Sequence, residues 1–589
     1  MDDEMTLRIA NCSGFYGDRL SAAREMVEGG PIDVLTGDWL AELTMLILAG
    51  NRLKGRPGYA PTFLRQLEDV LGPCLDKGIK IVTNAGGLDP AGCAQAVHEL
   101  AGRLGLSPAV AHVTGDDLTG RALDLVNADT GERLDATPLT ANAYLGARPI
   151  AAALSAGADV VVTGRVTDAA LVTGPGIWRY GWGPEDLDPL AGSVVAGHVI
   201  ECGCQATGGN YAFFQDVPDL AHCGFPIAEL RADGSAVITK HPGTGGLVSV
   251  GTVTAQLVYE LGGPRYLGPD VVARFDTITL ADDGPDRVLV SGVRGEPPPG
   301  TLKVAVNYLG GYRNTMTLVL TGLDIEAKAR VAEEAVWARI PRDAFDSVDV
   351  TLTESGLLRI TVMDADQRTA GRAFSSAVVE TGLASYPGFY GLTPPGNASP
   401  YGVYWPVLVP AADVRPQVFL NGKELPPTEP TPTRPAPDAP TARPILDTLA
   451  AQPTPDTPDR SVASTSTGTP VAGTSTDRPA VRVPLGRIAG ARSGDKGGNA
   501  NLGVWTTTAA RYDWLAAHLT TATLKELLPD LAGHRIDRYE LPSIKALNFV
   551  VHGLLGRGVA ASPRLDPQAK ALGEELRARL VDLPADLYD

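Results

Sequence analysis

Arg165 and Asp168 follow the segment of the chain that is most typical of a buried strand, and their side chains suit two chemical tasks. The segment Gly157-Ala-Asp-Val-Val-Val-Thr-Gly-Arg-Val-Thr-Asp168 begins with a turn, runs through three valines and breaks at Thr163-Gly164. A guanidinium can hold a carboxylate through paired hydrogen bonds. A carboxyl group whose pKa is raised by burial can transfer a proton near neutral pH. The alternative role for Thr167 or Asp168 is to cap a helix that starts after the break.

Three other predicted strands end in the same way, with threonine followed by glycine or asparagine. The four strand ends are Leu35-Thr-Gly-Asp38, Val82-Thr-Asn-Ala85, Val113-Thr-Gly-Asp116 and Val162-Thr-Gly-Arg165. Glycine and asparagine adopt the backbone angles that end a strand sharply, and parallel strands place their carboxyl ends on one edge of a sheet. We therefore expect one polar rim that contains Asp38, Asn84, Asp116, Asp117, Arg165 and Asp168. The alternative for each single residue is that it only caps a neighbouring helix.

This rim predicts a site for a small molecule that carries an anionic group. Arg165 is the first choice for that group, because it is the only cation among the four strand ends. Asp116 or Asp168 would move a proton, and Asn84 with neighbouring glycine N–H groups would bind a developing oxyanion. Asp38 is expected to contact the substrate.

Several glycine-rich turns are further candidates, because backbone N–H groups in such turns can cradle an anion. The turns lie at residues 11–18, 84–90, 205–211 and 493–501. The predicted substrate-binding positions are Gly14, Gly17, Asp38, Gly86, Gly87, Gly208, Gly209, Asn210 and Lys496. Each turn is equally compatible with a plain structural loop. Cys12 stands where a dinucleotide-binding turn has its first glycine, so we predict no dinucleotide cofactor.

Cysteines and histidines gather between residues 198 and 223, where they raise the question of a metal site. His198-Val-Ile-Glu-Cys-Gly-Cys204 is followed by His222-Cys223, and His198 and Cys202 would share one face of a helix. Zinc is bound by such side chains, but the spacing matches no established ligand pattern, so we predict no metal. A reactive thiol at Cys202 or Cys204 stays open, because no base can be assigned to it. A buried, inert cysteine is the default.

The elements that must position these residues alternate between strand and helix over residues 1–224. Strands are predicted at 7–12, 32–36, 79–83, 110–114 and 157–163, and helices near 18, 39, 61, 90, 115 and 142. Gly72-Pro73 is expected to end the helix that begins at Pro61, and Asp89 with Pro90 fits the start of the next one. This alternation predicts βαβ units, a mostly parallel sheet and thus the α/β fold class.

The rest of the chain divides into three segments. Residues 225–423, with strands at 235–240, 287–291, 302–306 and 315–320 and helices at 325–338 and 371–383, predict an α+β middle domain that is either separate or continuous with the first. Residues 424–480 hold 13 of the 47 prolines and no aromatic residue, which predicts a disordered linker with at most one helical turn, at 445–451. Residues 481–589 predict a small α+β sandwich with a loop at 493–501 and a terminal helix at 567–581.

The composition excludes several classes of protein. The net charge of −18 and the pI of about 5.0 argue against a nucleic-acid-binding surface. No window of 18 apolar residues lacks a charge, so no membrane span is predicted. Six cysteines in 589 residues do not form a disulfide framework, and the acidic N-terminus differs from a signal peptide. We therefore expect a reduced, cytoplasmic protein.

Several of these stretches together resemble the acyclic terpene utilisation (AtuA) family. They are Arg8-Ile-Ala-Asn-Cys-Ser-Gly-Phe-Tyr-Gly-Asp18, Val34-Leu-Thr-Gly-Asp-Trp-Leu-Ala-Glu42, Thr83-Asn-Ala-Gly-Gly87, the segment through Asp168, and Glu201-Cys-Gly-Cys-Gln-Ala-Thr-Gly-Gly209. Ala491-Arg-Ser-Gly-Asp-Lys-Gly-Gly-Asn499 looks like part of the ferredoxin-fold domain that accompanies this family, so the resemblance implies a ferredoxin-like domain over 481–589. The family name implies the breakdown of citronellol-like or geraniol-like isoprenoid acids as CoA thioesters. It supplies no catalytic residues to carry over.

Two functions are compatible with these observations. The first is a cytoplasmic enzyme that acts on a branched carboxylic acid or acyl-CoA by cofactor-free acid–base chemistry, such as hydration, dehydration or C–C cleavage next to a carbonyl. The alternative is a non-catalytic ligand-binding or assembly subunit of an acyl-CoA or terpenoid degradation system. The expected partner is a small molecule, in which CoA enters only as part of the substrate, and neither nucleic acid nor a membrane is expected. We also predict a homo-oligomer in which the C-terminal domain completes the site of a neighbouring subunit.

Overall fold

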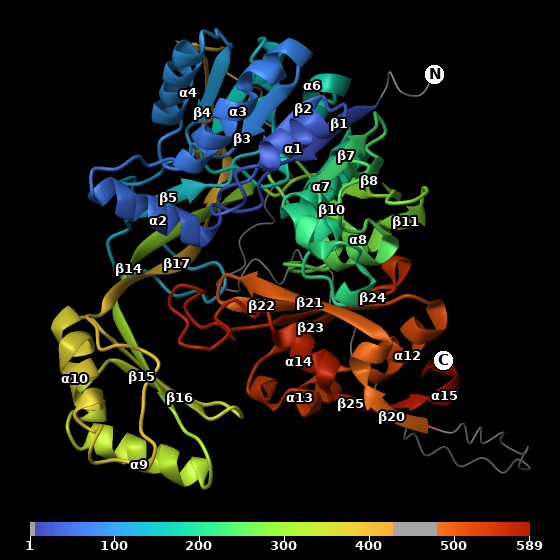
Figure 1. The fold of residues 1–589 in the computed structure, drawn as a ribbon. Helices are drawn as coiled ribbons and strands as arrows, with labels where there is room; N and C mark the ends of the chain where they lie inside the picture. Colours follow the sequence, from blue (N-terminus) through green and yellow to red (C-terminus); the bar gives the residue numbers. More distant parts are fainter. Residues whose placement is uncertain (1–5, 428–479, 589) are drawn as a thin grey trace, which may run out of the picture.

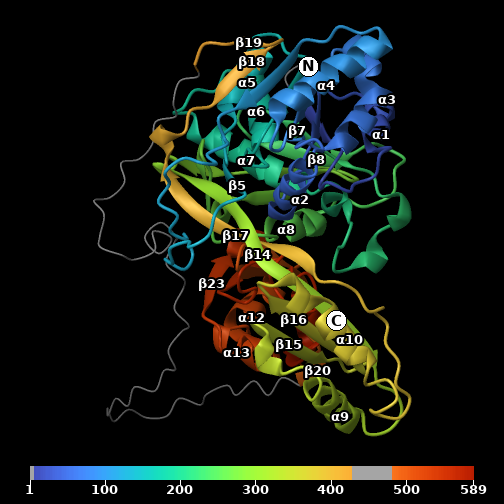
Figure 2. The same cartoon turned by 90° about the vertical axis from the view of Figure 1, so that its left-hand side faces the viewer.

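The computed structural model describes residues 6–427 and 480–588, which form two bodies and a projecting lobe. The larger body is built on an 11-stranded sheet, and the C-terminal residues form a smaller body that lies against it (Figure 1). The lobe extends from the larger body on two long strands, as Figure 2 shows from the side. The predicted linker at 424–480, with its helical turn at 445–451, lies outside the described residues except at its two ends.

Five parallel strands form the centre of the large sheet. In spatial order they are β1 (Leu7–Asn11), β2 (Val34–Gly37), β3 (Lys80–Thr83), β6 (Val160–Thr163) and β4 (Val110–Thr114). Every adjacent pair among them is parallel. The predicted α/β fold class with a mostly parallel N-terminal sheet is confirmed.

Helices cover both faces of this centre, which explains why its strands are almost continuously apolar. One face carries α1 (Ala22–Gly29), α3 (Pro61–Lys77) and α4 (Pro90–Leu104), and the other carries α5 (Arg148–Ser155), α6 (Ala170–Tyr180) and α7 (Leu187–Ile200). Successive residues of a strand point to opposite faces. Accordingly, Ile81 and Val160 belong to the hydrophobic core on the side of α1, α3 and α4. Val82 and Val161 belong to the core on the side of α5, α6 and α7.

Antiparallel strands from the middle of the chain extend the sheet on both sides. Next to β1 come β7 (Pro226–Leu230), β8 (Ala236–Lys240), β12 (Val288–Ser291) and β11 (Thr279–Asp282), and next to β4 come β18 (Gln417–Leu420) and β19 (Lys423–Glu424). A small separate sheet contains β9 (Arg265–Leu267), β10 (Val272–Arg274) and β13 (Arg294–Glu296), and α8 (Val250–Leu257) lies between β8 and β9 in the chain. The predicted boundary at 224/225 therefore falls inside a region that builds one continuous sheet.

Four local predictions within this body are wrong. α3 runs through Gly72 and Pro73 and ends only at Gly78, because its apolar face stays buried beyond the proline. No helix begins at 115–117, where Asp117 forms a β-bridge to Asn142. Residues 140–143 are a strand, so the helix predicted from 142 starts only at Arg148. Finally, α6 begins at Ala170 after Ala169, so neither Thr167 nor Asp168 is its N-cap.

The lobe is built around one exceptionally long strand. β14 (Thr301–Val319) leaves the larger body, where it pairs with β5 (Thr140–Ala143), and continues into the lobe, where it pairs with β16 (Leu357–Asp364). The other elements of this region are β15 (Ser347–Leu352), β17 (Ser399–Pro410), α9 (Ile325–Trp337), a π-helical turn (Thr369–Ala373) and α10 (Phe374–Val379). The two strands predicted at 302–306 and 315–320 are thus a single strand, whose Gly310-Gly311 pair marks a β-bulge.

The C-terminal body has the expected ferredoxin-like domain. Its antiparallel sheet has the order β21 (Ala489–Lys496), β22 (Asn499–Thr506), β24 (Ala546–Val551) and β23 (Ile536–Leu541). One face packs on helices, which are α12 (Ala509–His518), α13 (Thr521–Leu527) and α14 (Leu572–Ala578). A ribbon of β20 (Ala480–Pro484) and β25 (Leu580–Pro584), followed by α15 (Ala585–Tyr588), completes it, so the predicted terminal helix is shorter than expected.

The other face of this sheet rests on the larger body. Trp505 belongs to the same hydrophobic core as the large sheet, and its ring stacks on that of Tyr211 with 6.1 Å between centroids. The Asn501 side chain accepts a hydrogen bond from the Glu260 N–H at 2.7 Å. The segment predicted as a loop at 493–501 is the tip of the β21–β22 hairpin, with a turn at Gly497-Gly498. No helix in the described part of the chain is long and apolar enough to cross a membrane.

Candidate functional site

The predicted polar rim exists, and Asp38 and Asn84 meet on it. β2, β3 and β6 lie side by side, so their carboxyl ends share one edge of the sheet. The Asn84 amide donates to Oδ1 of Asp38 at 2.5 Å, and the Asn84 side-chain oxygen accepts from the Trp39 N–H at 2.7 Å. Both halves of the amide are therefore engaged. Asn84 positions the Asp38 carboxyl group, and a role for its second N–H at an oxyanion stays a prediction.

Arg165 is almost completely buried close to this pair, with 3% of its surface exposed. Its guanidinium donates to the Leu40 carbonyl at 2.5 Å and lies 3.5 Å from the Asp168 carboxylate. It also stacks on Tyr144, with 4.3 Å between Cζ and the ring centroid. Its Nε has no hydrogen-bond partner among the described residues. A buried guanidinium with a free donor is suited to bind an anion.

Asp116 supports Arg165 from the end of β4. One of its carboxylate oxygens accepts from the Arg165 backbone N–H and from the Asn142 amide, both at 2.9 Å. Burial raises the pKa of Asp116 to about 6, against the effect of these two hydrogen bonds. The contacts fix the backbone at Arg165, so they make Asp116 a positioning residue. Asp117 is exposed and accepts from the Thr119 N–H instead.

Glu42, Tyr144 and Lys303 complete the surroundings of Arg165. Glu42 starts α2 (Glu42–Leu53), and its Oε1 accepts from the Tyr144 hydroxyl at 3.2 Å and lies 3.9 Å from the Lys303 ammonium. Burial favours a higher pKa for Glu42, but the charges of Lys303 and Arg165 outweigh it and hold that pKa below its usual value. The side chains of Lys303 and Glu42 keep 37% and 32% of their surface exposed. Both are thus accessible to a solute although they lie beside the buried Arg165.

The end of α7 contributes Glu201, which is 8% exposed. Its Oε1 lies 3.5 Å from Nδ1 of His198, and its Oε2 has no hydrogen-bond partner in the described structure. Burial, followed by the charges of Asp168 and Asp38, raises the pKa of Glu201 well above its usual value. Burial also lowers the pKa of His198 to about 4, so this imidazole is neutral near pH 7.

The β21–β22 hairpin brings Lys496 to the same place from the C-terminal body. The Lys496 ammonium lies 5.7 Å from the centroid of Tyr266, and its charge opposes the rise in the pKa of both Asp168 and Glu201 that burial causes. A Cβ on the next residue, Gly497, would stand 3.3 Å from the Tyr404 ring. The C-terminal domain therefore reaches the sheet edge of its own chain. Completion of a neighbouring subunit's site, and the homo-oligomer itself, stay predictions.

We call these side chains the charged cluster: Asp38, Glu42, Arg165, Asp168, Glu201, Lys303 and Lys496. Four carboxyl groups face three cations, so protons must offset part of the excess negative charge. Burial, and then the charge of Asp168, raises the pKa of Asp38 to about 8. Burial also raises the pKa of Asp168, against the opposing charge of Arg165. Asp38 therefore carries a proton near neutral pH, which it can donate.

Three polar atoms of the charged cluster are buried without a hydrogen-bond partner among the described residues. They are Nε of Arg165, Oδ1 of Asp168 and Oε2 of Glu201. Buried donors and acceptors are nearly always paired in native proteins. Oδ1 of Asp168 is the oxygen that lies 3.5 Å from Nη1 of Arg165, so the donor Nε of Arg165 and the acceptor Oε2 of Glu201 are the open groups that mark where a polar ligand would be bound.

The predicted glycine turns are explained by close packing of the backbone. A Cβ on Gly14 would stand 2.7 Å from the Cys202 carbonyl carbon, one on Gly86 would stand 2.5 Å from the Thr163 carbonyl oxygen, and one on Gly209 would stand 2.8 Å from the Cys204 carbonyl oxygen. At Gly17, Gly87 and Gly208 the nearest atoms belong to the side chains of Phe15, Leu48 and Val217. These glycines let segments approach one another, and the structure does not gather them into one anion-binding loop.

Asn210, the remaining predicted contact of this kind, takes part in docking the C-terminal body. Its backbone adopts the left-handed region, with φ of 56°, and its carbonyl accepts from Arg492 at 2.7 Å. The same arginine binds the Gln205 side chain. The turn at 205–211 therefore holds the domain that supplies Lys496.

The cysteine and histidine side chains of residues 198–223 do not converge on one point. His222 is exposed and pairs with Asp219, with 2.7 Å between Nδ1 and Oδ1, whereas Nε2 of the buried His198 lies 3.2 Å from the Gln256 carbonyl. Cys204 lies instead against Cys223. Within residues 6–427 and 480–588, no group of three or more His, Cys, Asp or Glu side chains could hold a metal ion.

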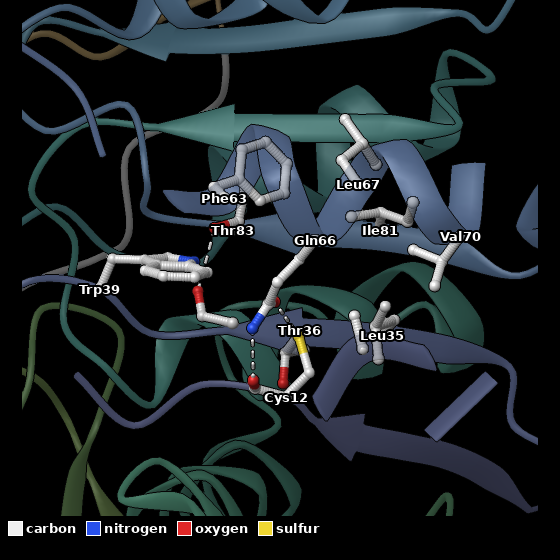
Figure 3. Close-up of a pocket in the computed structure, with 12 residues that line it drawn as sticks. Cys12, Leu35, Thr36, Trp39, Phe63, Gln66, Leu67, Val70, Ile81 and Thr83 are labelled. Atoms are coloured by element: carbon white, nitrogen blue, oxygen red, sulfur yellow. Dashed lines mark hydrogen bonds between the residues drawn. The ribbon is translucent and has the colours of Figure 1, made fainter. Parts of the chain in front are cut away.

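A small cavity lies in the core close to the rim, lined by side chains of α3 and of the strands β2 and β3 (Figure 3). It measures about 10 Å³, which is at most the space of one water molecule. Cys12 and Gln66 bind each other there, with 3.4 Å from the Gln66 amide to the Cys12 carbonyl oxygen. No residue of the charged cluster lines this cavity. It is a packing gap of the core.

Sequence reasoning missed part of the charged cluster. Glu42 ends one of the stretches that carry the family resemblance, and Glu201 begins another, so both could have been singled out there. Lys303 stands in a predicted strand without any motif, and Tyr144 was assigned to a helix. Neither offered a signal, because their place depends on the pairing of β14 with β5.

Comparison with known families covers most of the described chain. A family model described as acyclic terpene utilisation family protein AtuA matches residues 7–420, which include the large body and the lobe. A second, described as AtuA ferredoxin-like domain, matches residues 483–582 and thus the body that supplies Lys496. Comparisons with curated proteins and with solved structures found no match. On the strength of the two family matches, this chain belongs to the acyclic terpene utilisation family AtuA.

Proposed function

We propose that this protein is an enzyme that moves protons next to the carbonyl group of a carboxylic acid or an acyl thioester. The observation that carries the proposal is the buried Arg165, whose free Nε lies in one cluster with two carboxyl groups, Asp38 and Asp168. A cation that binds the carbonyl or carboxylate end makes the neighbouring C–H bond more acidic, and a carboxyl group beside it can then take or give the proton.

The two carboxyl groups suit opposite tasks. Asp38 has its pKa raised to about 8 by burial and by the charge of Asp168, so it carries a proton at neutral pH and serves as the acid. Asp168 keeps 28% of its side chain exposed, and its Oδ1, which lies 3.5 Å from Nη1 of Arg165, makes no hydrogen bond among the described residues, so Asp168 serves as the base. Burial raises the pKa of both groups, and the charge of an ionised Asp168 raises that of Asp38 further, so this pair favours a protonated Asp38 beside an ionised Asp168.

Lys303 and Lys496 would add two cations to the binding of the substrate's anionic end. Lys303 is 37% exposed beside Glu42, and Lys496 reaches the cluster from the hairpin tip. Family membership supports a branched carboxylic acid or its CoA thioester as the substrate class. Hydration, dehydration and C–C cleavage beside a carbonyl all require such a proton transfer, and they are the reactions that we propose.

Hydrogen exchange tests this chemistry without knowledge of the complete reaction. The full-length protein is incubated in deuterated water with branched and linear short-chain acids and with their CoA thioesters, and mass spectrometry follows deuterium at the carbon next to the carbonyl. We expect exchange with at least one compound. Asp168→Asn should slow it by about a hundredfold, because a positioned base contributes roughly 10²–10⁴ in rate.

Matched variants distinguish the loss of a charged-cluster residue from a general loss of folding. Lys496→Met removes a cation of the cluster from the partly exposed hairpin tip, so the variant should fold but bind the acid more weakly in calorimetry. Lys525→Met, on α13 of the same domain, and Asp117→Asn, outside the cluster, should leave both binding and exchange unchanged. Equal exchange rates in Asp168→Asn and wild type would refute the assignment. Tight binding in wild type with neither exchange nor turnover would favour a non-catalytic binding protein.

A further inference from the structure

Cys204 and Cys223 lie against each other at the two ends of one folded segment. Cys204 belongs to η2 (Gly203–Thr207), and Cys223 follows η4 (Leu220–His222). Sγ of Cys204 donates to the Cys223 carbonyl at 3.3 Å, and Sγ of Cys223 lies 3.9 Å from the Cys204 carbonyl. The two thiols are also hydrogen-bond partners of each other, and both are free.

Cationic and polar groups surround this pair. Arg19 lies 3.7 Å from Sγ of Cys204 and donates to the Cys223 carbonyl at 2.7 Å, while its guanidinium stacks on Phe225. Oγ1 of Thr207 is 3.3 Å from Sγ of Cys223. The Cys204 thiol, then the Thr207 hydroxyl and the charge of Arg19, outweigh burial and lower the pKa of Cys223 to about 6. The pair thus carries a thiolate near neutral pH, which is the nucleophilic form of cysteine.

The other four cysteines have no such environment. Burial raises the pKa of Cys12, Cys74 and Cys93 and keeps them as inert thiols. Burial, followed by the charge of Glu201, raises the pKa of Cys202 well above its usual value. Cys202 is therefore an internal reference, because it neighbours Cys204 in the sequence but burial and the charges of Glu201, Glu260 and Asp38 outweigh the charge of Lys570.

We propose that Cys204 and Cys223 form a redox-active dithiol that a hydroperoxide oxidises to a disulfide. The Cys223 sulfur attacks the peroxide, the O–O bond breaks, and the leaving oxygen departs with a proton as water or as an alcohol. The resulting sulfenic acid of Cys223 is attacked by the Cys204 sulfur, the S–S bond forms, and the hydroxyl leaves with the Cys204 proton as water. Two thiols lose two electrons in all, and the peroxide gains them. Cys223 is buried and Cys204 beside it is partly exposed, so the oxidant would reach the attacking sulfur from the Cys204 side of the pair.

This dithiol would act on the contact between the two bodies. The segment that it closes contains Asn210, whose carbonyl binds Arg492, and Tyr211, whose ring stacks on Trp505. A bond between the two ends of the segment would fix the surface on which the C-terminal domain rests. The inference does not depend on the proposed acid–base chemistry, because neither thiol belongs to the charged cluster.

Thiol mapping in the full-length protein tests the proposal. The reduced protein is treated with hydrogen peroxide, its remaining thiols are alkylated, and chymotrypsin, which cleaves after Phe213 and Phe214, releases the two ends as separate peptides. Two of the six thiols should be lost, and one cross-linked product should contain Cys204 and Cys223. Oxidation at pH 7 should be about tenfold faster than that of free glutathione, because far more of the pair is thiolate.

Serine variants make the assignment unique. Cys202→Ser should keep the cross-link, whereas Cys204→Ser and Cys223→Ser should abolish it while circular dichroism shows an unchanged fold. A disulfide between Cys202 and Cys204, a cross-link that disappears in Cys202→Ser, or an oxidation rate no higher than that of glutathione would each overturn the proposal.

Discussion

Replacing Asp116 by asparagine should remove a pH dependence of stability that its buried carboxyl group imposes. Burial raises the pKa of Asp116 from 3.8 to about 6 in the folded protein. A raised pKa means that the folded state holds the proton more tightly than the unfolded chain does. The stabilisation is therefore complete below pH 3.8 and is lost as the pH rises through 6, because the folded protein must then bury a charged carboxylate.

The size of this effect follows from the two pKa values. A tenfold change in a protonation equilibrium corresponds to about 1.36 kcal/mol, so the full window from 3.8 to about 6 is worth roughly 3 kcal/mol. About 1 kcal/mol of it falls between pH 5 and pH 7. Asp116 is only 2% exposed, so solvent screening does not diminish the figure much.

Urea unfolding of the wild type and Asp116→Asn at pH 5, 6 and 7 measures the difference. Asparagine keeps an oxygen for the Arg165 N–H, so the variant should fold. Relative to the wild type, its free energy of unfolding should increase by about 1 kcal/mol from pH 5 to pH 7. Asp117→Asn, which changes the exposed neighbour, should show no such trend. A constant difference between Asp116→Asn and wild type over this range would refute the burial argument.

Three further predictions concern the fold. Gly192→Ala, on α7, should lower the free energy of unfolding by about 1–3 kcal/mol in thermal or urea unfolding, since its Cβ would stand 2.1 Å from the Gly234 carbonyl oxygen. The control Gly102→Ala, which has open space around it, should raise the free energy of unfolding by up to about 1 kcal/mol. Trp505→Ala should cost about 3–5 kcal/mol and loosen the C-terminal body, detectable as faster proteolysis, because Trp505 fills the core shared with the larger body. Light scattering should show a mass above 61.5 kDa, because the lobe exposes several apolar side chains, among them Leu323, Leu383 and Leu392. A monomer would contradict the homo-oligomer.

The centre of the fold was predictable because its signals are local. Short β-branched runs that end in threonine and then glycine or asparagine identified β2, β3, β4 and β6. Parallel pairing then placed Asp38, Asn84, Arg165 and Asp168 on one edge. The same logic did not reveal the structural role of Asp116, whose assignment to proton transfer stays a prediction. Its position at a strand end does not reveal that both hydrogen bonds of its carboxylate go to neighbours on the same rim.

The remainder of the charged cluster depends on pairings between distant parts of the chain. Lys303 is placed by the pairing of β14 with β5, in which Asn307 binds Thr140 from 167 positions away. Lys496 is placed by the docking of a second domain, in which the side chains of Asn501 and Trp505 carry the contact. No local pattern encodes such contacts. The two strands predicted at 302–306 and 315–320 lie on either side of the Gly310-Gly311 bulge.

The last strands of the large sheet have a consequence for the synthesis of the chain. β18 pairs with the outer side of β4, and the Asn421 side chain accepts from the Val110 N–H at 2.9 Å across 311 positions of sequence. Until the ribosome has produced those positions, including the whole lobe, β4 presents unpaired backbone groups that invite pairing with other chains. In the finished protein the edge of the sheet is β19, a strand of only two residues, Lys423 and Glu424, both of them charged. A nascent chain that stops before residue 417 would therefore aggregate through β4, whereas one that extends past residue 424 would not.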